Sequence, residues 1–320
     1  MDINRDNMDV FFEELRVAFT EGFNAPRENN ILTNVAMTVP SATAQTVHAW
    51  LNQIPQMREW LGDRQKQDVQ SNKLTVANRK FEDTIPMKRE EIEDDLHRLY
   101  IGLSQLMGNS ADAFRDELLI EALLRGTSDE WVDEVAVFSN AGRTYGDNTI
   151  DNYNTVAFDA AGVQLNAVYT KMVSYLGQQN KPLRVRPRWL IHGPELRSAT
   201  IAALEKEYTA ILNPDASTYV QGNNTNMGLL TRVETPYLVD GYVDSLGNSY
   251  DAASYWYVVA EIGGIRGLAY QDRKGPEIQT SRLSDESDHV FENDEYQFGV
   301  RMRGAAFVTL PHLVFANVVA

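Results

Sequence analysis

Apolar residues at three- and four-residue spacing from residue 92 onward constrain this chain most, because that spacing requires a long amphipathic helix. The first part of the stripe is Ile92, Leu96, Leu99, Leu103 and Leu106. After Gly108-Asn109-Ser110 it continues with Phe114, Leu118, Ala122 and Leu123, up to Gly126. The interruption allows two interpretations, one long helix with a kink or two helices nearly in line.

A charged, alternating segment precedes this helix. Leu74 and Val76 share one face of an extended chain, whereas Phe81 and Ile85 fall on the opposite parity, so a bulge or turn is expected between the pairs. Lys, Arg, Asp and Glu fill the remaining positions up to a break at Pro86. The pattern over residues 69–85 predicts an exposed two-stranded ribbon, which is marginal in water unless something covers it. The acids between residues 90 and 95 are typical of the first turn of a helix.

The rest of the chain mixes helical and strand patterns, which predicts an α+β fold. Helices are expected from residue 11 to 19, around residues 48–62 and over 163–176, and extended chain over 33–45. Residues 139–162 and 213–228 have the composition of loops. Residues 181–208 predict a strand, a turn and a helix that starts at Pro194. Apolar strands are expected within residues 235–243 and 254–262, and a buried strand ends the sequence.

Composition and charge exclude several classes of function. The 320 residues are enough for about two domains, and they include no cysteine, so disulfides and thiolate chemistry are excluded. No apolar run is long enough to span a membrane, and the first fifteen residues do not resemble a signal peptide, so we expect a cytosolic protein and no membrane partner. A net charge of −16 argues against a broad nucleic-acid-binding surface.

A search for catalytic, metal-binding and cofactor motifs finds no convincing site, so no cofactor and no enzymatic activity are predicted. The five histidines lack metal-ligand spacing. The glycines at 263, 264 and 267 are interpreted as a tight turn and not a phosphate cradle. His192 lies where a strand meets a helix, but no nucleophile or acid stands beside it, so a hydrogen-bonded structural histidine is favoured. The acidic segment 284–295 lacks the ligand order of an EF-hand and is interpreted as a solvated loop.

Three arginines, Arg184, Arg186 and Arg188, alternate along one extended segment and therefore share a face. Such a row could bind phosphates or pair with acids of a neighbouring subunit. In so acidic a chain we favour the second. Trp60 in MREWLGDR is compatible with either a core or a recognition role.

Two long phrases, TVPSATAQTVHAWLNQIPQMREWLGDR and NRKFEDTIPMKREEIEDD, closely resemble the Mu-like phage major head subunit family, whose members have the HK97-like capsid fold. The C-terminal phrases RKGPEIQTS, FENDEYQFGVRMRG and LPHLVFA also resemble that family. The likeness is strong over about residues 10–127 and fair over 185–320, and little is recognisable over 130–184.

The resemblance implies a major capsid protein with an N-terminal arm (1–49), an extended loop or E-loop hairpin (50–89), a peripheral domain with a spine helix (90–160), an axial domain (161–283) and a return to the peripheral domain (284–320). It implies hexamers and pentamers in an icosahedral virion capsid around double-stranded DNA. Scaffold, portal and possibly decoration proteins would be partners, and the host bacterial cytoplasm would be the place of assembly. The expected subunit-interface residues are Arg58, Trp60, Arg64, Lys66, Arg79, Lys80, Glu82, Asp83, Arg184, Arg186 and Arg188.

Two alternatives stay open at this point. One is an encapsulin-like compartment shell of the same fold. The other is a soluble α+β enzyme that works at His192.

Overall fold

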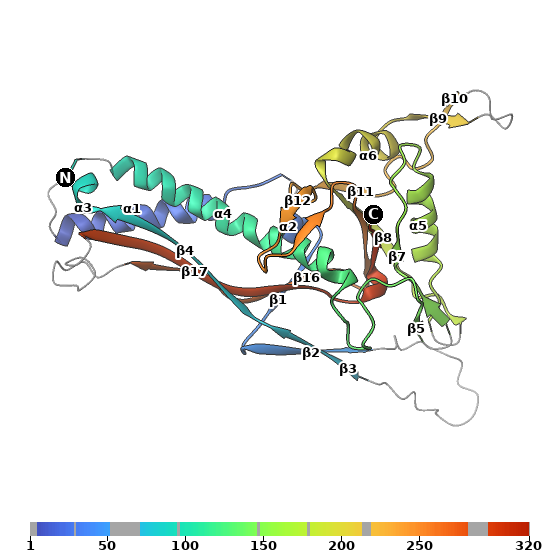
Figure 1. Ribbon diagram of the computed structural model, residues 1–320, viewed down its shortest axis with the longest axis horizontal. Helices are drawn as coiled ribbons and strands as arrows, with labels where there is room; N and C mark the ends of the chain where they lie inside the picture. The colour runs from blue at the N-terminus through green and yellow to red at the C-terminus, as the bar shows by residue number, and fades with distance from the viewer. Residues whose placement is uncertain are drawn as a thin grey trace.

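The computed structural model describes residues 5–28, 30–51, 71–94, 97–145, 148–177, 180–212, 219–280 and 294–319. An elongated part with two long helices above a long sheet continues into a second part that carries two shorter helices (Figure 1). Both parts combine helices with sheets, so the predicted α+β class is confirmed.

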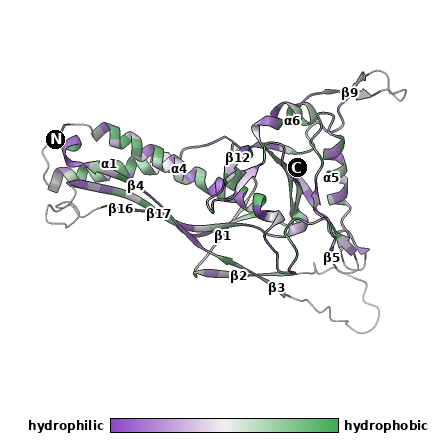
Figure 2. Cartoon of the chain, in the orientation of Figure 1, coloured by the Kyte–Doolittle hydropathy of each residue, from purple (hydrophilic) through white to green (hydrophobic). Residues whose placement is uncertain are grey.

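The elongated part is built on a four-stranded sheet. Its order is β1 (Met37–Pro40), β16 (Leu268–Thr280), β17 (Glu295–Val308) and β4 (Arg79–Lys88). Helices α1 (Arg5–Phe23) and α4 (His97–Leu124) lie side by side against it, and the short α3 (Arg89–Glu93) follows β4. Apolar and polar residues are interleaved along α1 and α4, as amphipathic helices require (Figure 2).

The spine of this part is one continuous helix. Residues 97–124 of α4 run without a break through Gly108-Asn109-Ser110, which decides between the two interpretations of the interruption. Gly108 permits close packing of α1, because a Cβ atom there would lie 2.2 Å from the carbonyl oxygen of Phe19. Ser104 Oγ also donates a 2.7 Å hydrogen bond to the carbonyl of Leu15. The glycine therefore marks a helix crossing and not a helix end.

The predicted apolar face of α4 is buried within the subunit in its second half and exposed in its first. Leu118 and Leu123 are buried, but Leu99, Leu103 and Leu106 are 55%, 37% and 63% exposed. In this half the helix turns Tyr100, Ser104 and Met107 to the core. The physical reason is the position of α1, which packs on Ser104 and Gly108 and so rotates the leucines away from the sheet.

The second part is built on the sheet β11 (Thr231–Glu234), β8 (Arg186–His192), β14 (Trp256–Ile262), β18 (Val314–Asn317) and β7 (Tyr153–Asn154), with β15 (Ile265–Arg266) paired to β14. The predicted helix at 163–176 is α5 (Val163–Val173), and the predicted strand, turn and helix are β8, a 3₁₀ turn from Pro194 and α6 (Arg197–Leu204). All four residues of β18 are buried, which confirms the predicted final strand. A short α2 (Ile31–Asn34) lies between α1 and β1.

Several local expectations were wrong. Gln45–Leu51 form strand β2, not a helix, because they pair antiparallel with β3 (Ser71–Ala77) over seven residues. Pro86 does not end β4, which runs to Lys88. As the edge strand of its sheet, β4 tolerates a proline.

The two segments expected to be loops contain short strands. Residues 139–162 hold β5 (Arg143–Tyr145), β6 (Asn148–Ile150) and β7, and β10 (Tyr219–Asn223) pairs with β9 (Tyr208–Leu212). A further hairpin, β12 (Asp240–Val243) and β13 (Ser249–Asp251), stands apart from both large sheets. Most of the predicted helix at 48–62 and most of the acidic segment 284–295 lie outside the described residues.

Candidate assembly surfaces

The ribbon of β2 and β3 is fixed to the long sheet at one face and open at the other. The His48 ring stacks on Phe307 at 5.0 Å, and its Nε2 lies 2.7 Å from Gln271 Oε1. The fully buried Gln271 amide donates to the carbonyl of Val76 at 3.3 Å and to Asn78 Oδ1 at 2.8 Å. The outward face presents Val47, which is 53% exposed. The predicted change of parity lies at Asn78, between β3 and β4. Before this residue the chain pairs with β2, and after it the chain pairs with β17.

The structure places four of the expected interface residues together at the start of β4. Lys80, Glu82 and Asp83 are exposed. Arg79 differs, because its Nη1 donates to Ser245 Oγ at 3.0 Å within the same chain. Arg58, Trp60, Arg64 and Lys66 lie outside the described residues.

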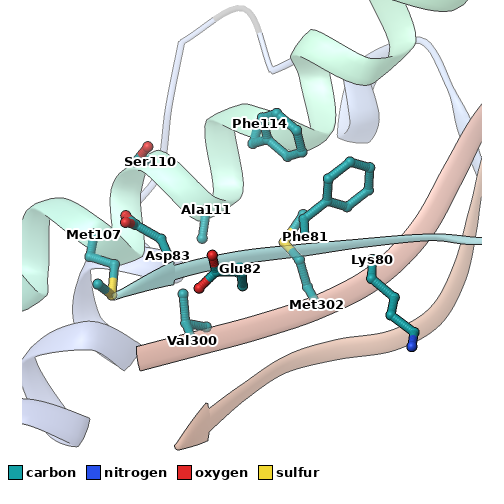
Figure 3. Close-up of a pocket in the computed structure, with 10 residues that line it drawn as sticks. All are labelled: Lys80, Phe81, Glu82, Asp83, Met107, Ser110, Ala111, Phe114, Val300 and Met302. Atoms are coloured by element: carbon teal, nitrogen blue, oxygen red, sulfur yellow. The ribbon is translucent and has the colours of Figure 1, made fainter. Parts of the chain in front are cut away.

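A pocket of about 410 Å³ opens where β4 passes under α4 (Figure 3). The rings of Phe81 and Phe114 meet edge to face inside it, with centroids 4.8 Å apart. The charged side chains of Lys80, Glu82 and Asp83 stand at its β4 side. The remaining lining residues are Met107, Ser110, Ala111, Val300 and Met302.

Three exposed leucines precede this pocket along the helix. Leu99, Leu103 and Leu106 precede Ser110 and Phe114 at four- and three-residue spacing, so all five lie on one face of α4. Large apolar side chains concentrated on an exposed surface are a mark of protein–protein contact. Sequence periodicity detected these leucines as part of an apolar helix face but did not say what covers that face.

The arginine row has the predicted exposure, but the predicted extended geometry holds only for Arg186 and Arg188, which lie in β8. Arg184 precedes the strand and has a left-handed backbone with φ of +60°, so it is exposed but does not continue the face of β8. Arg188 pairs with Glu261 at 2.7 Å. Within the part of the chain that the structure describes, Arg184 and Arg186 have no acidic partner. Arg186 lies directly across the sheet from Glu261, whose carboxylate contacts Arg188.

His192 has the structural role favoured from the sequence. It is fully buried, with Nδ1 2.7 Å from the Gly193 carbonyl and Nε2 3.2 Å from Thr200 Oγ1. Burial lowers its pKa, so the neutral ring is favoured. The glycines at 263 and 264 have φ values of +55° and +90° between β14 and β15, which confirms a tight turn. The described residues contain no group of acids and histidines able to hold a metal ion.

This arrangement of a projecting ribbon, a spine helix beside a long sheet and a separate second sheet is the HK97-like fold of phage capsid proteins. A chain from the procapsid of bacteriophage JBD30 aligns with 99% of this chain and 76% of its own, at a TM-score of 0.55 and 21% sequence identity. At that identity the likeness shows the fold alone.

The family follows from the sequence comparison. The model of the Mu-like prophage major head subunit gpT family matches residues 8–162 and 239–318, and the chain belongs to that family. The family is one of structural head subunits, not enzymes. In the described part of the chain, no helix combines the length and the apolar character needed to cross a membrane.

Two curated relatives agree with this assignment. The major capsid protein of Escherichia phage Mu is 35% identical over 103 residues, which are 32% of this chain and 33% of the relative. The Mu-like prophage FluMu major head subunit of Haemophilus influenzae is 37% identical over 94 residues, which are 29% of this chain and 30% of the relative. The aligned regions therefore span about a third of each of these relatives.

Proposed function

We propose that this chain is the major capsid subunit of a Mu-like phage or prophage head. Copies of it would assemble through hexamers and pentamers into an icosahedral shell around double-stranded DNA. The family match over both the elongated part and the end of the chain carries this proposal. The capsid fold is consistent with this function, but it does not carry the proposal, because a fold alone does not define a function.

The physical properties of the single subunit support self-assembly. Its ribbon has an open outer face, its spine helix exposes three leucines, and two exposed arginines form no ion pair within the described chain. Each feature is unfavourable in an isolated subunit in water and becomes favourable when a neighbouring copy covers it. Many modest contacts around a closed shell add through multivalency, so no single interface needs to be strong.

The division into arm, E-loop, peripheral, axial and returning segments is part of the proposal. In this division α1 and β1 belong to the arm (1–49), and β3 and β4 to the E-loop (50–89), whose other strand begins at residue 45. The spine helix α4 opens the peripheral domain (90–160), and the axial domain (161–283) holds β8 and β14. Residues 284–320 bring the chain back to the long sheet through β17, and β18 then pairs with β14 of the axial sheet.

We also propose which charges serve the contacts between subunits. Glu82 is exposed on β4, so its replacement by lysine should reduce particle yield and leave the circular dichroism spectrum of the subunit unchanged. The same is expected of charge reversal at Arg58 or Arg64. Loss of folded signal in these variants would assign the residues to the subunit's own stability instead.

The excess negative charge bears on the packaged DNA. With 45 acids against 29 lysines and arginines, the shell protein would repel DNA over most of its surface. We therefore expect no sequence-specific contact and weak binding of duplex DNA to purified capsomers at low salt. Tight binding in that titration would contradict this part of the proposal.

The proposal also includes other partners and a place of assembly. Scaffold, portal and possibly decoration proteins would bind the shell, and assembly would take place in the host bacterial cytoplasm.

Negative-stain electron microscopy of the expressed protein tests the function. Closed hollow particles are expected, and a monodisperse monomer or small oligomer would contradict the proposal. A cellular compartment shell would also give hollow particles, so the neighbouring genes decide between the two. Phage head and packaging genes support the head, and an isolated host gene beside a cargo enzyme supports the compartment.

A further inference from the structure

The hairpin of β12 and β13 is an excursion from the second part of the molecule onto the spine helix. It lies in the chain between β11 and β14, which belong to the second sheet, yet it pairs only with itself. In Figure 1 it stands beside the C-terminal half of α4. An isolated two-stranded hairpin is marginally stable at best, so its contacts with α4 must hold it in place.

Tyr242 and Tyr250 of the hairpin pack against the main core, and a polar network adds to this packing. The fully buried carboxylate of Glu121 accepts hydrogen bonds from Ser245 N and Ser245 Oγ, both at 2.6 Å. Arg125 Nη1 donates to the same carboxylate at 3.3 Å. One helical turn earlier, Glu117 accepts a 2.9 Å hydrogen bond from the Tyr242 hydroxyl. At the hairpin tip Val243 and Leu246 remain 56% and 59% exposed, so apolar burial of the tip does not fix the hairpin.

The base of the ribbon, meaning Asn78 and Arg79 where β3 continues into β4, joins the same network. Arg79, the first residue of β4, donates from Nη1 to Ser245 Oγ at 3.0 Å, and the same atom lies 3.7 Å from Glu121 Oε2. Arg79 also lies over the ring of Phe81 at 5.1 Å. Three segments far apart in sequence therefore meet at one buried carboxylate: the ribbon base, the spine helix and the hairpin.

A buried carboxylate makes this junction cooperative. Charged groups in a low-dielectric site are stable only when their partners are in place, and hydrogen bonds in one network strengthen each other. If Arg79 moves with the ribbon, Ser245 and Glu121 lose a charged donor and the hairpin loses part of what holds it. Thermodynamic coupling of this kind is reciprocal, so movement of the hairpin also loosens the ribbon base.

We propose that the junction of Arg79, Ser245 and Glu121 is a conformational clasp, that is, a contact that couples the position of the hairpin in the axial region to the direction of the ribbon. In a shell, a neighbour's contact with the ribbon would thereby be transmitted to the part of the subunit that carries the axial sheet. This purpose rests on the proposed capsid function, whereas the coupling itself is a property of the single subunit and is measurable there.

Amide hydrogen exchange of unassembled subunits, followed by mass spectrometry, tests the clasp. Arg79→Ala should raise exchange in residues 240–251 about tenfold, which corresponds to about 1.4 kcal/mol of lost protection. Ser245→Ala should in turn raise exchange at the start of β4. Lys80→Ala is the matched control, because Lys80 is the exposed neighbour of Arg79 and forms no hydrogen bond or ion pair with the described hairpin. Helix α5 is the internal reference for global stability.

Two results would overturn the proposal. The first is unchanged exchange of the hairpin in Arg79→Ala, which would mean that Tyr242 and Glu121 hold it alone. The second is an equal rise in the hairpin and in α5, which would mean that the substitution lowers global stability without specific coupling. Neither result depends on whether particles form, so failure of the clasp is distinguishable from failure of the capsid proposal.

Discussion

Leu106 and Leu119 lie on the same helix, and their replacement by alanine should have opposite consequences for folding and for assembly. Leu106 is 63% exposed in the subunit, whereas Leu119 is fully buried in the main core. Complete burial of a leucine side chain is worth about 1.5 to 3 kcal/mol, so the buried third of Leu106 accounts for less than about 1 kcal/mol. Leu119→Ala removes the whole contribution and leaves a cavity, at a cost of about 2 to 5 kcal/mol.

Urea denaturation of dilute, unassembled subunits, monitored by far-ultraviolet circular dichroism, measures the two costs. Particle yield at matched subunit concentration measures assembly. Leu106→Ala should denature close to the wild type and yet give fewer particles, because we propose that another copy covers the exposed leucines of α4 in the shell. A cost for Leu106→Ala equal to that for Leu119→Ala would place this face in the subunit core. Wild-type particle yield would show that the shell leaves the face open.

Three further predictions concern packing, pH and charge. Gly108→Ala should destabilise the subunit by about 1 to 3 kcal/mol in the same urea assay, because its Cβ would clash with the backbone of α1, whereas Gly102→Ala, with open space around it, should be neutral or stabilising. Burial and the nearby Arg143 charge lower the pKa of His312 to about 4, below its ordinary value of 6.5. Stability should therefore fall as the pH drops from about 6.5 towards 4, by roughly 2 kcal/mol between pH 7 and pH 5, and His312→Asn should lack this part of the urea-midpoint shift. Arg186→Gln, which removes the charge without placing a second acid opposite Glu261, should lower particle yield without lowering the urea midpoint, and an unchanged yield would exclude a role for Arg186 in assembly.

The sequence predicted those features that depend on local pattern. Alternation predicted that the arginines at 184, 186 and 188 are exposed, and Pro194 located the start of the helical segment after β8. The position of His192 at a strand end, together with the lack of a catalytic partner, correctly predicted a structural histidine. Each of these features depends on residues within a few positions of each other.

The errors came from contacts between distant segments. The periodicity of Leu99, Leu103 and Leu106 describes an apolar helix face correctly, but spacing alone does not say whether the covering surface belongs to the same chain. Strand β2 exists because β3 pairs with it, and such pairing overrides local propensity. The junction at Glu121 joins residues 79, 121 and 245, and no sequence motif marks it.

A cryo-electron microscopy reconstruction of the assembled particles, resolved at the level of side chains, tests the account most directly. We expect a closed shell in which the outer face of the ribbon around Val47 and the α4 face around Leu106 both contact other copies of the chain. A shell in which both surfaces face solvent, or the absence of any shell, would contradict it.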